Sequence, residues 1–142
     1  MSIVYLGLGS NIGDRKGFIH QAVDLLAGRC VKPLRLSTII ETAPVGGPPQ
    51  GLFLNAVLKA ESFLSPLQLL RLLHQIEERL GRVRTVKNGP RTIDIDILLY
   101  DNLVLNTPEL VLPHPRMHLR DFVMRPLREI DPDAVTSLNQ DF

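Results

Sequence analysis

The segment Gly89-Pro90-Arg91-Thr92-Ile93-Asp94-Ile95-Asp96-Ile97-Leu98 alternates isoleucine with aspartate, and Leu99 and Tyr100 continue it. Side chains of a β-strand point to its two faces in turn, so this alternation predicts a strand with two different faces. One face would carry Ile93, Ile95, Ile97 and Leu99, and the other Thr92, Asp94, Asp96, Leu98 and Tyr100. The strand is therefore expected to pack its isoleucines into a core and to present its carboxylates on the opposite side.

Asp94 and Asp96 would lie roughly 6–7 Å apart along that face. Two carboxylates held so close repel each other unless a cation lies between them. Mg²⁺ suits such a pair, because it binds through one or two carboxylates together with substrate phosphates, and Arg91 offers those phosphates a planar fork. The alternative is a solvated face with two exposed aspartates, but aspartate is depleted in strands. The segment favours a site for metal-assisted phosphoryl transfer.

The rest of the chain predicts an α+β fold. Strands are expected over 2–8, 34–41, 53–61 and 103–106 besides 92–100. One helix follows Asp14 as N-cap and ends near Gly28, and a second runs from Ser65-Pro66 to Gly81. A glycine-rich turn is expected over 7–11, a rigid corner over 113–116, and a helical segment over 118–127 that ends near Pro126. The order β-α-β-β-α-β predicts a ferredoxin-like core, with a mainly antiparallel sheet, packed helices and mobile active-site loops over 42–51 and 82–89.

Length and composition limit the function. The 142 residues form one domain, 1–142, with no role assigned to a short tail over 136–142. A net charge of +1 gives no general attraction to nucleic acid or membranes. The single cysteine, Cys30, and the lack of a long apolar run or secretory leader predict a cytoplasmic protein. A monomer is expected.

Three further groups each allow two or more interpretations. The cations Arg82, Arg84, Lys87 and Arg91 form either a solvated basic loop or a polyphosphate site beside the aspartates. The corner Pro113-His114-Pro115-Arg116-Met117-His118 is structural, binds phosphate, or holds zinc, although Pro115 argues against a helical zinc pair. The glycines of residues 7–13 do not match the dinucleotide fingerprint, because the third falls one position late.

Phe53 and Asn55 share one face of their predicted strand, two residues apart. A stacking ring and an amide that both donates and accepts would suit a flat heteroaromatic ligand. The alternative is that Phe53 belongs to the core and Asn55 caps an edge. Phe122 has the same ambiguity.

Together these residues resemble the 6-hydroxymethyl-7,8-dihydropterin pyrophosphokinases. The resemblance extends from Val4 to Ile130, and its strongest blocks are 81–84, 89–98 and 113–117. It implies a ferredoxin-like fold that transfers the terminal pyrophosphoryl unit of ATP to the pterin hydroxymethyl group, releasing AMP, in folate biosynthesis. It also implies two Mg²⁺ ions, held by Asp94 and Asp96, and ATP as co-substrate.

The same resemblance implies roles for individual residues. The catalytic residues would be Arg82, Arg84 and Arg91. ATP would be bound by Glu77, Arg84, Arg91, Ile97, His114, Arg116 and Arg120. The pterin would be bound by Thr42, Pro44, Val45, Gly46, Phe53, Asn55, Asp94 and Phe122.

This chain departs from some family members, since it has no tryptophan before Gly89 and a slightly short loop over 85–88. Three rival functions are weaker. An RNA-binding module would need more aromatic residues and a basic sheet. An inactive relative would be expected to lose Asp94, Asp96 or Arg91, and a nicotinamide oxidoreductase would need an intact glycine pattern.

Overall fold

The sheet consists of antiparallel strands from both halves of the chain. The structure, a computed structural model, describes residues 1–82 and 89–141. Strands β1 (Ser2–Ser10), β2 (Val31–Leu36), β4 (Phe53–Ser62) and β5 (Asp94–Tyr100) lie in the order β2-β4-β1-β5. A short strand, β3 (Ile40–Thr42), also pairs with β4. β1 lies between β4 and β5, so β5 is at one edge of the sheet.

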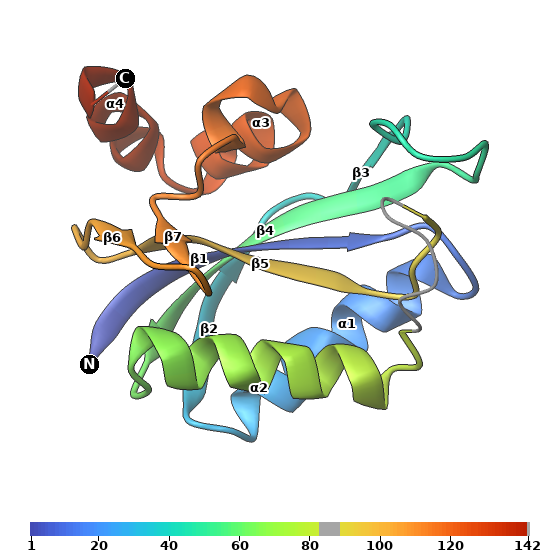
Figure 1. Cartoon of the computed structure of the whole chain (residues 1–142), viewed down its shortest axis with the longest axis horizontal. Helices are drawn as coiled ribbons and strands as arrows, with labels where there is room; N and C mark the ends of the chain where they lie inside the picture. The colour runs from blue at the N-terminus through green and yellow to red at the C-terminus, as the bar shows by residue number, and fades with distance from the viewer. Residues whose placement is uncertain (83–88, 142) are drawn as a thin grey trace.

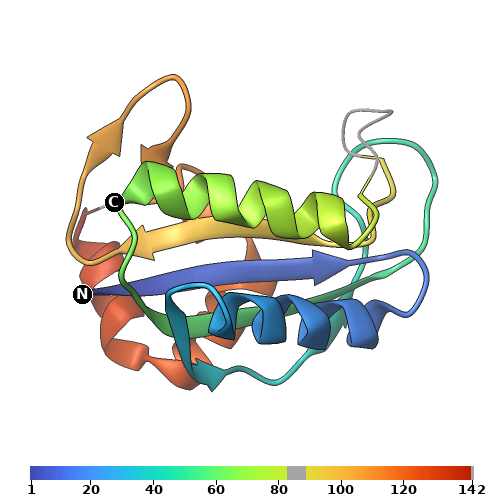
Figure 2. The ribbon, with the colours of Figure 1, turned by 90° about the horizontal axis from the view of Figure 1, so that it is seen from below.

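Helices cover both faces of this sheet. α1 (Arg15–Ala27) and α2 (Pro66–Arg79) lie side by side on one face, and α3 (Asp121–Ile130) and α4 (Pro132–Asp141) lie on the other (Figures 1 and 2). A small hairpin of β6 (Leu105–Asn106) and β7 (Val111–Leu112) and a 3₁₀ turn (Met117–Leu119) lead into α3. The ferredoxin-like βαββαβ core is confirmed. No helix within residues 1–82 and 89–141 is long and apolar enough to cross a membrane.

The two long helices begin where the sequence predicts. The Asp14 carboxylate accepts from the Gly17 N–H at 3.1 Å and caps α1, and α1 ends at Gly28. Ser65 caps α2 through a reciprocal pair of hydrogen bonds with Gln68, with Pro66 in the first turn. These caps satisfy backbone N–H groups that a helix start leaves without partners.

The sheet separates two apolar cores. The larger lies against α1 and α2 and includes Ile93, Ile95 and Ile97, and the smaller lies under α3 and includes Leu98. The predicted alternation holds up to Leu98 and then reverses, because Leu99 packs with the smaller core and Tyr100 with the larger. The cause is a β-bulge, at which Leu6 pairs with Ile97 and Tyr5 with Leu99, so that Leu98 has no opposite residue.

Two predictions about the first half of the chain are wrong. Residues 7–11 do not form a turn, because β1 continues to Ser10 and pairs on both sides. The single strand predicted over 34–41 is two strands, β2 and β3. Between them the Ser37 N–H donates to the Val57 carbonyl at 2.9 Å, but the Val57 N–H donates to the Ser37 hydroxyl at 2.8 Å, so a side chain takes the place of one backbone acceptor there.

The helix near the C-terminus is longer than predicted. α3 does not end near Pro126 but continues to Ile130, with Pro126 inside it. A proline cannot donate the helical hydrogen bond at its position. The burial of Leu127 and Ile130 in the smaller core compensates for that loss and stabilises the longer helix. The unassigned tail begins within α4.

Candidate functional site

Two cavities open beside the acidic strand. The first, of about 220 Å³, lies between the sheet, α3 and the segment that follows β3. It is lined by Gly7, Leu8, Gly9, Thr42, Ala43, Val45, Gly46, Phe53, Asn55, Ala56, Arg91, Asp94, Asp96, Leu98, Arg116, Arg120, Phe122 and Val123. The second, of about 470 Å³, lies between α2, β5 and the segment around β7. Its polar lining includes His74, Glu77, Arg82, Arg91, Asp94, Asp96, Glu109, His114 and Arg120.

Four residues line both cavities: Arg91, Asp94, Asp96 and Arg120. The two aspartates share a face of β5, as the alternation predicts, and the two arginines approach them from the segment before β5 and from the start of α3. The boundary between the cavities is therefore a strip of two carboxylates and two guanidinium groups. Such a strip can bind an anion and a cation together.

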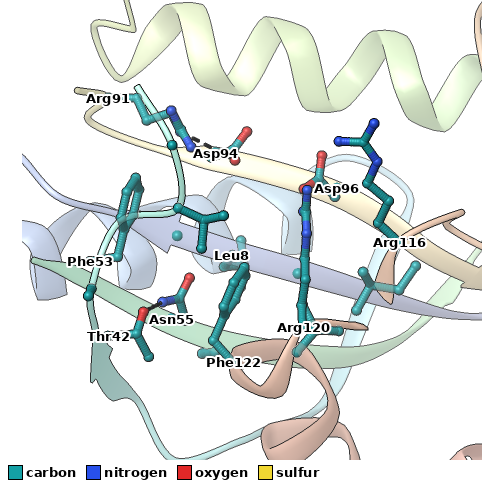
Figure 3. A pocket seen from close by; sticks show the side chains of 18 residues that line it. Leu8, Thr42, Phe53, Asn55, Arg91, Asp94, Asp96, Arg116, Arg120 and Phe122 are labelled. Carbon is teal, nitrogen blue, oxygen red and sulfur yellow. Dashed lines mark hydrogen bonds and ion pairs between the residues drawn. The ribbon is translucent and has the colours of Figure 1, made fainter. Parts of the chain in front are cut away.

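The wall of the first cavity opposite this strip is aromatic and amide-rich. Figure 3 shows Phe53, Asn55 and Phe122 across the pocket from Asp94 and Asp96. Phe53 and Asn55 lie on one face of β4, as predicted, and both are almost fully buried. Asn55 Nδ2 donates to Thr42 Oγ1 at 2.5 Å, which fixes the amide at the cavity wall.

Gly9 leaves room for that amide. A Cβ atom at this position would lie 3.0 Å from Asn55 Oδ1 and 3.6 Å from Phe53 Cδ1. The glycine at this point of β1 therefore keeps the floor of the cavity open.

An ion-pair cluster closes one end of the second cavity. Arg82 Nη1 donates to Glu77 Oε2 at 2.7 Å and to Asp94 Oδ1 at 2.8 Å. Glu77 is buried and also accepts from the Ile95 N–H at 2.9 Å, so α2, β5 and Arg82 meet at one carboxylate. Burial alone would lower the pKa of Arg82, but the charges of Asp94 and Glu77 outweigh it and raise that pKa above its ordinary value.

Asp96 has a pKa far from its ordinary value. Burial raises the pKa of Asp96 to about 7, and the negative charges of Asp94 and Glu77 add to this, while Arg120 and Arg82 oppose it. The carboxylate therefore carries its charge at a cost that a nearby cation would relieve.

His114 lies in the second cavity close to positive charge. Its pKa is lowered from the ordinary value, first by burial and then by the charge of Arg120, so the neutral imidazole is favoured. A neutral imidazole can still donate one hydrogen bond to a phosphate oxygen. Arg120 also lies over the Phe122 ring at 5.7 Å, so it borders the aromatic wall of the first cavity.

The structure brings most of the predicted site residues together. Of the residues predicted for the pterin, the first cavity is lined by Thr42, Val45, Gly46, Phe53, Asn55, Asp94 and Phe122. Of those predicted for ATP, the second is lined by Glu77, Arg91, Ile97, His114 and Arg120.

Three predicted residues stand apart. Pro44 is not among the residues that line the first cavity in the described ranges, although both its neighbours are. Arg116 lines the first cavity and not the second. Arg84 and most of the predicted loop over 82–89 lie outside the described residues.

Asn11 makes contacts near the site that sequence reasoning missed. It follows β1 directly, and its side-chain amide bonds Gln50, Gly51 and Arg91. A polar residue at the end of an apolar strand was the available signal, but its three partners lie about 40 and 80 residues away in sequence and could not be predicted.

No cluster of three or more His, Cys, Asp or Glu side chains suited to a metal occurs in residues 1–82 and 89–141. The zinc alternative for the corner around His114 and His118 therefore gains no support. Two carboxylates alone leave most coordination positions to water or to a ligand. This pattern is typical of a Mg²⁺ ion shared with phosphates.

Comparison with known proteins gives a consistent result. Residues 5–132 match the family model for 7,8-dihydro-6-hydroxymethylpterin-pyrophosphokinase (HPPK). A 2-amino-4-hydroxy-6-hydroxymethyldihydropteridine pyrophosphokinase from Bacillus subtilis is 48% identical over 130 residues, 91% of this chain and 78% of that protein. The protein of the same name from Aquifex aeolicus is 45% identical over 135 residues, 95% of this chain and 84% of its own length.

A solved structure supports the fold. Wild-type HPPK-DHPS of Plasmodium falciparum with pteroate superimposes with a TM-score of 0.70 at 16% identity. The match covers 90% of this chain and 38% of that larger chain.

Proposed function

The chain belongs to the 7,8-dihydro-6-hydroxymethylpterin-pyrophosphokinase family, and we propose that its first cavity binds the pterin and its second binds ATP. The protein is a diphosphotransferase of folate biosynthesis. It transfers pyrophosphate from ATP to the hydroxymethyl group of 6-hydroxymethyl-7,8-dihydropterin and releases AMP. What we add is the assignment of its residues to the steps of this reaction.

The assignment of the pterin and ATP to these two cavities rests on the strip of residues that the cavities share. Arg91, Asp94, Asp96 and Arg120 line both, so ligands in the two cavities would meet there. A hydroxymethyl group from the first cavity and a phosphate chain from the second would thus lie side by side. Bringing two reactants together in a fixed orientation is itself a large part of catalysis.

In the first cavity the pterin ring would lie between the rings of Phe53 and Phe122. Asn55 both donates and accepts, so it can read the edge of a ring that carries amide and amine groups. Its bond to Thr42 holds the amide in one orientation. The backbone of residues 43–46 would complete this edge.

In the second cavity the phosphates would lie against Arg91, His114 and Arg120. Arg91 Nε is a buried donor without a hydrogen-bond partner within the described ranges, and it lies 3.4 Å from Asp94 Oδ2. An unsatisfied guanidinium N–H beside a ligand cavity supports a role in binding an anion.

Asp94 and Asp96 fit Mg²⁺, because burial and then the charge of Asp94 raise the pKa of Asp96, and a cation would offset both effects. Two Mg²⁺ ions held there would supply positive charge to neutralise the charge that develops on the phosphates. We assign both carboxylates to this role. Arg82 would move from Asp94 to the phosphates when the metals bind.

In the reaction the hydroxymethyl oxygen attacks the β-phosphorus of ATP and loses its proton. The bond from that phosphorus to the oxygen bridging the α-phosphate breaks, and AMP departs with this oxygen. Arg82, Arg84 and Arg91 would stabilise the charge on the transferred group. We also propose that the protein acts as a monomer in the cytoplasm.

The test is to incubate the protein with ATP, Mg²⁺ and 6-hydroxymethyl-7,8-dihydropterin and to identify the nucleotide product by ion-exchange chromatography. AMP and a pterin diphosphate in equal amounts are expected. ADP with a pterin monophosphate would contradict the transfer of two phosphates together. Asp96→Ala should lower turnover at least about 1,000-fold, and activity within a few-fold of wild type would refute its role in metal binding.

A further inference from the structure

Asn11 joins two segments that border the site, although it lines neither cavity itself. Its Oδ1 accepts from the backbone N–H of Arg91 at 2.9 Å. Its Nδ2 donates to Gln50 Oε1 at 2.8 Å and to the Gly51 carbonyl at 3.1 Å. The side chain thus uses both of its donors and its acceptor, and it is only 7% exposed.

The backbone strengthens the same connection. The Asn11 N–H donates to the Arg91 carbonyl at 3.1 Å, so these two residues exchange hydrogen bonds on both sides of the Arg91 backbone. On the other segment, a Cβ atom at Gly51 would lie 3.2 Å from the Asn11 carbonyl oxygen. Both segments are therefore packed tightly against one residue at the end of β1.

The two joined segments belong to different parts of the site. Arg91 lines both cavities, ion-pairs with Asp94 and lies 4.7 Å over the Phe53 ring. Gln50 and Gly51 end the segment whose earlier residues, Ala43, Val45 and Gly46, line only the first cavity. A shift of this segment toward a ligand would act on the Arg91 backbone through Asn11.

We propose that Asn11 is a positioning residue that couples the two ligand sites. Through Asn11, a pterin that orders residues 43–51 also holds Arg91 in place for the phosphates, so each ligand strengthens binding of the other. Such coupling is reciprocal by thermodynamic necessity. The inference rests on the proposed assignment of the two cavities, and it adds a residue that touches neither ligand.

The chain offers a matched control. Arg15 Nη1 donates to the Leu52 carbonyl at 2.9 Å and to Glu41 Oε2 at 3.0 Å, so its hydrogen bonds hold residues that flank the same segment and none of them goes to Arg91. Arg15→Ala removes one anchor of the segment but leaves the connection to Arg91 intact. Asn11→Ala removes every side-chain hydrogen bond of that connection, and Gln50→Ala removes one of them while leaving the bonds of Asn11 to Gly51 and Arg91.

The experiment measures the dissociation constant of the dihydropterin by its fluorescence, in Mg²⁺, with and without saturating α,β-methylene-ATP. The ratio of the two constants reports the coupling. In the wild type and in Arg15→Ala the nucleotide analogue should tighten pterin binding at least about tenfold. In Asn11→Ala the ratio should fall to within about twofold of one, and in Gln50→Ala it should fall between that value and the wild-type ratio.

A ratio that stays at the wild-type value in Gln50→Ala and in a folded Asn11→Ala would overturn the inference, as would a wild-type ratio of one. Gln50→Ala provides the test if Asn11→Ala does not fold, since Gln50 is more exposed than Asn11. A wild type that binds neither ligand would instead contradict the assignment of the cavities. Melting temperatures of all variants separate a loss of coupling from a loss of folding.

Discussion

The guanidinium of Arg82 donates to Asp94 Oδ1 at 2.8 Å. A cation of the protein therefore lies against a carboxylate that we assign to Mg²⁺. Glu77 holds the same guanidinium from the other side at 2.7 Å. Binding of a metal to Asp94 would have to compete with Arg82, and this competition would release the arginine toward the phosphates.

Arg82→Gln should therefore bind divalent metal more tightly without nucleotide. Removal of the Arg82 guanidinium leaves Asp94 and Glu77 without their shared cation, and uncompensated carboxylates attract metal. We expect Mn²⁺, titrated by its paramagnetic resonance signal, to bind about three- to tenfold more tightly. Turnover with both substrates should fall at least about 100-fold, since the charge on the transferred group loses a partner.

Arg79→Gln is the matched control, because Arg79 is an exposed arginine at the end of α2, which also carries Glu77. It removes the same charge without touching Asp94. Equal Mn²⁺ affinities for Arg82→Gln and the wild type would show that the ion pair does not compete with metal.

The raised pKa of Asp96 predicts how stability depends on pH when metal is absent. An aspartate has a pKa near 3.8 in the unfolded chain and about 7 here, so between these values the folded protein binds more protons. The free energy of unfolding should then fall as pH rises from about 4 to 7. Because Asp96 borders two open cavities, solvent screens it, and we expect a loss of about 1–2 kcal/mol rather than the full value for the shift.

Urea denaturation at pH 5 and pH 8, in a chelating buffer, measures this loss. Asp96→Asn should reduce the pH dependence, because the amide does not titrate, and saturating Mg²⁺ should reduce it in the wild type. If Asp96→Asn retains the full pH dependence of the free energy of unfolding, a titrating group other than Asp96 causes it.

Gly9→Ala should weaken pterin binding and leave nucleotide binding unchanged. Its Cβ would lie 3.0 Å from Asn55 Oδ1, so the amide that we assign to the pterin edge must shift by a few tenths of an ångström. A tenfold weaker pterin affinity is expected by fluorescence titration, equal to about 1.4 kcal/mol. Gly7→Ala is the comparison, since its Cβ meets only the Leu98 side chain at 3.4 Å, and its effect should be smaller. Equal effects in the two variants would contradict the role given to Asn55.

Phe53→Ala should affect both ligands. The ring forms part of the first cavity and also lies under the Arg91 guanidinium at 4.7 Å. Pterin affinity should fall at least about tenfold and ATP affinity about two- to fivefold, as measured by calorimetry. Phe63→Ala, at a side chain that is 63% exposed, should change neither. An unchanged ATP affinity in Phe53→Ala would show that the contact between the ring and Arg91 does not affect nucleotide binding.

Much of the fold follows from local patterns. Asp14, Ser65 and Pro66 mark helix starts through their own chemistry, and the alternation around Asp94 predicts a strand with a carboxylate face. The reversal after Leu98 could not be predicted, because a bulge depends on the partner strand and here lies opposite Tyr5 and Leu6. The division of the second predicted strand depends likewise on the bond between Ser37 and Val57, across 20 residues.

Part of the site likewise follows from local sequence patterns, and part depends on tertiary contacts. Asp94, Asp96 and Arg91 are close in sequence, and their residue types in this pattern indicate phosphate and metal chemistry. The place of Arg116 in the first cavity and the ion pairs of Arg82 depend on how three separate segments approach β5. Such contacts depend on tertiary packing, which no local pattern encodes.

Glu77 has a consequence for the behaviour of the protein in solution. β5 is an edge strand, and edge strands offer unpaired amides that can recruit a strand from another molecule. The Glu77 carboxylate accepts from the Ile95 N–H, and the His114 N–H donates to the Leu98 carbonyl, so one amide and one carbonyl of this strand are already bonded within the same chain. Glu77 and His114, which line the second cavity, thus also leave fewer groups of the acidic strand available to pair with another molecule.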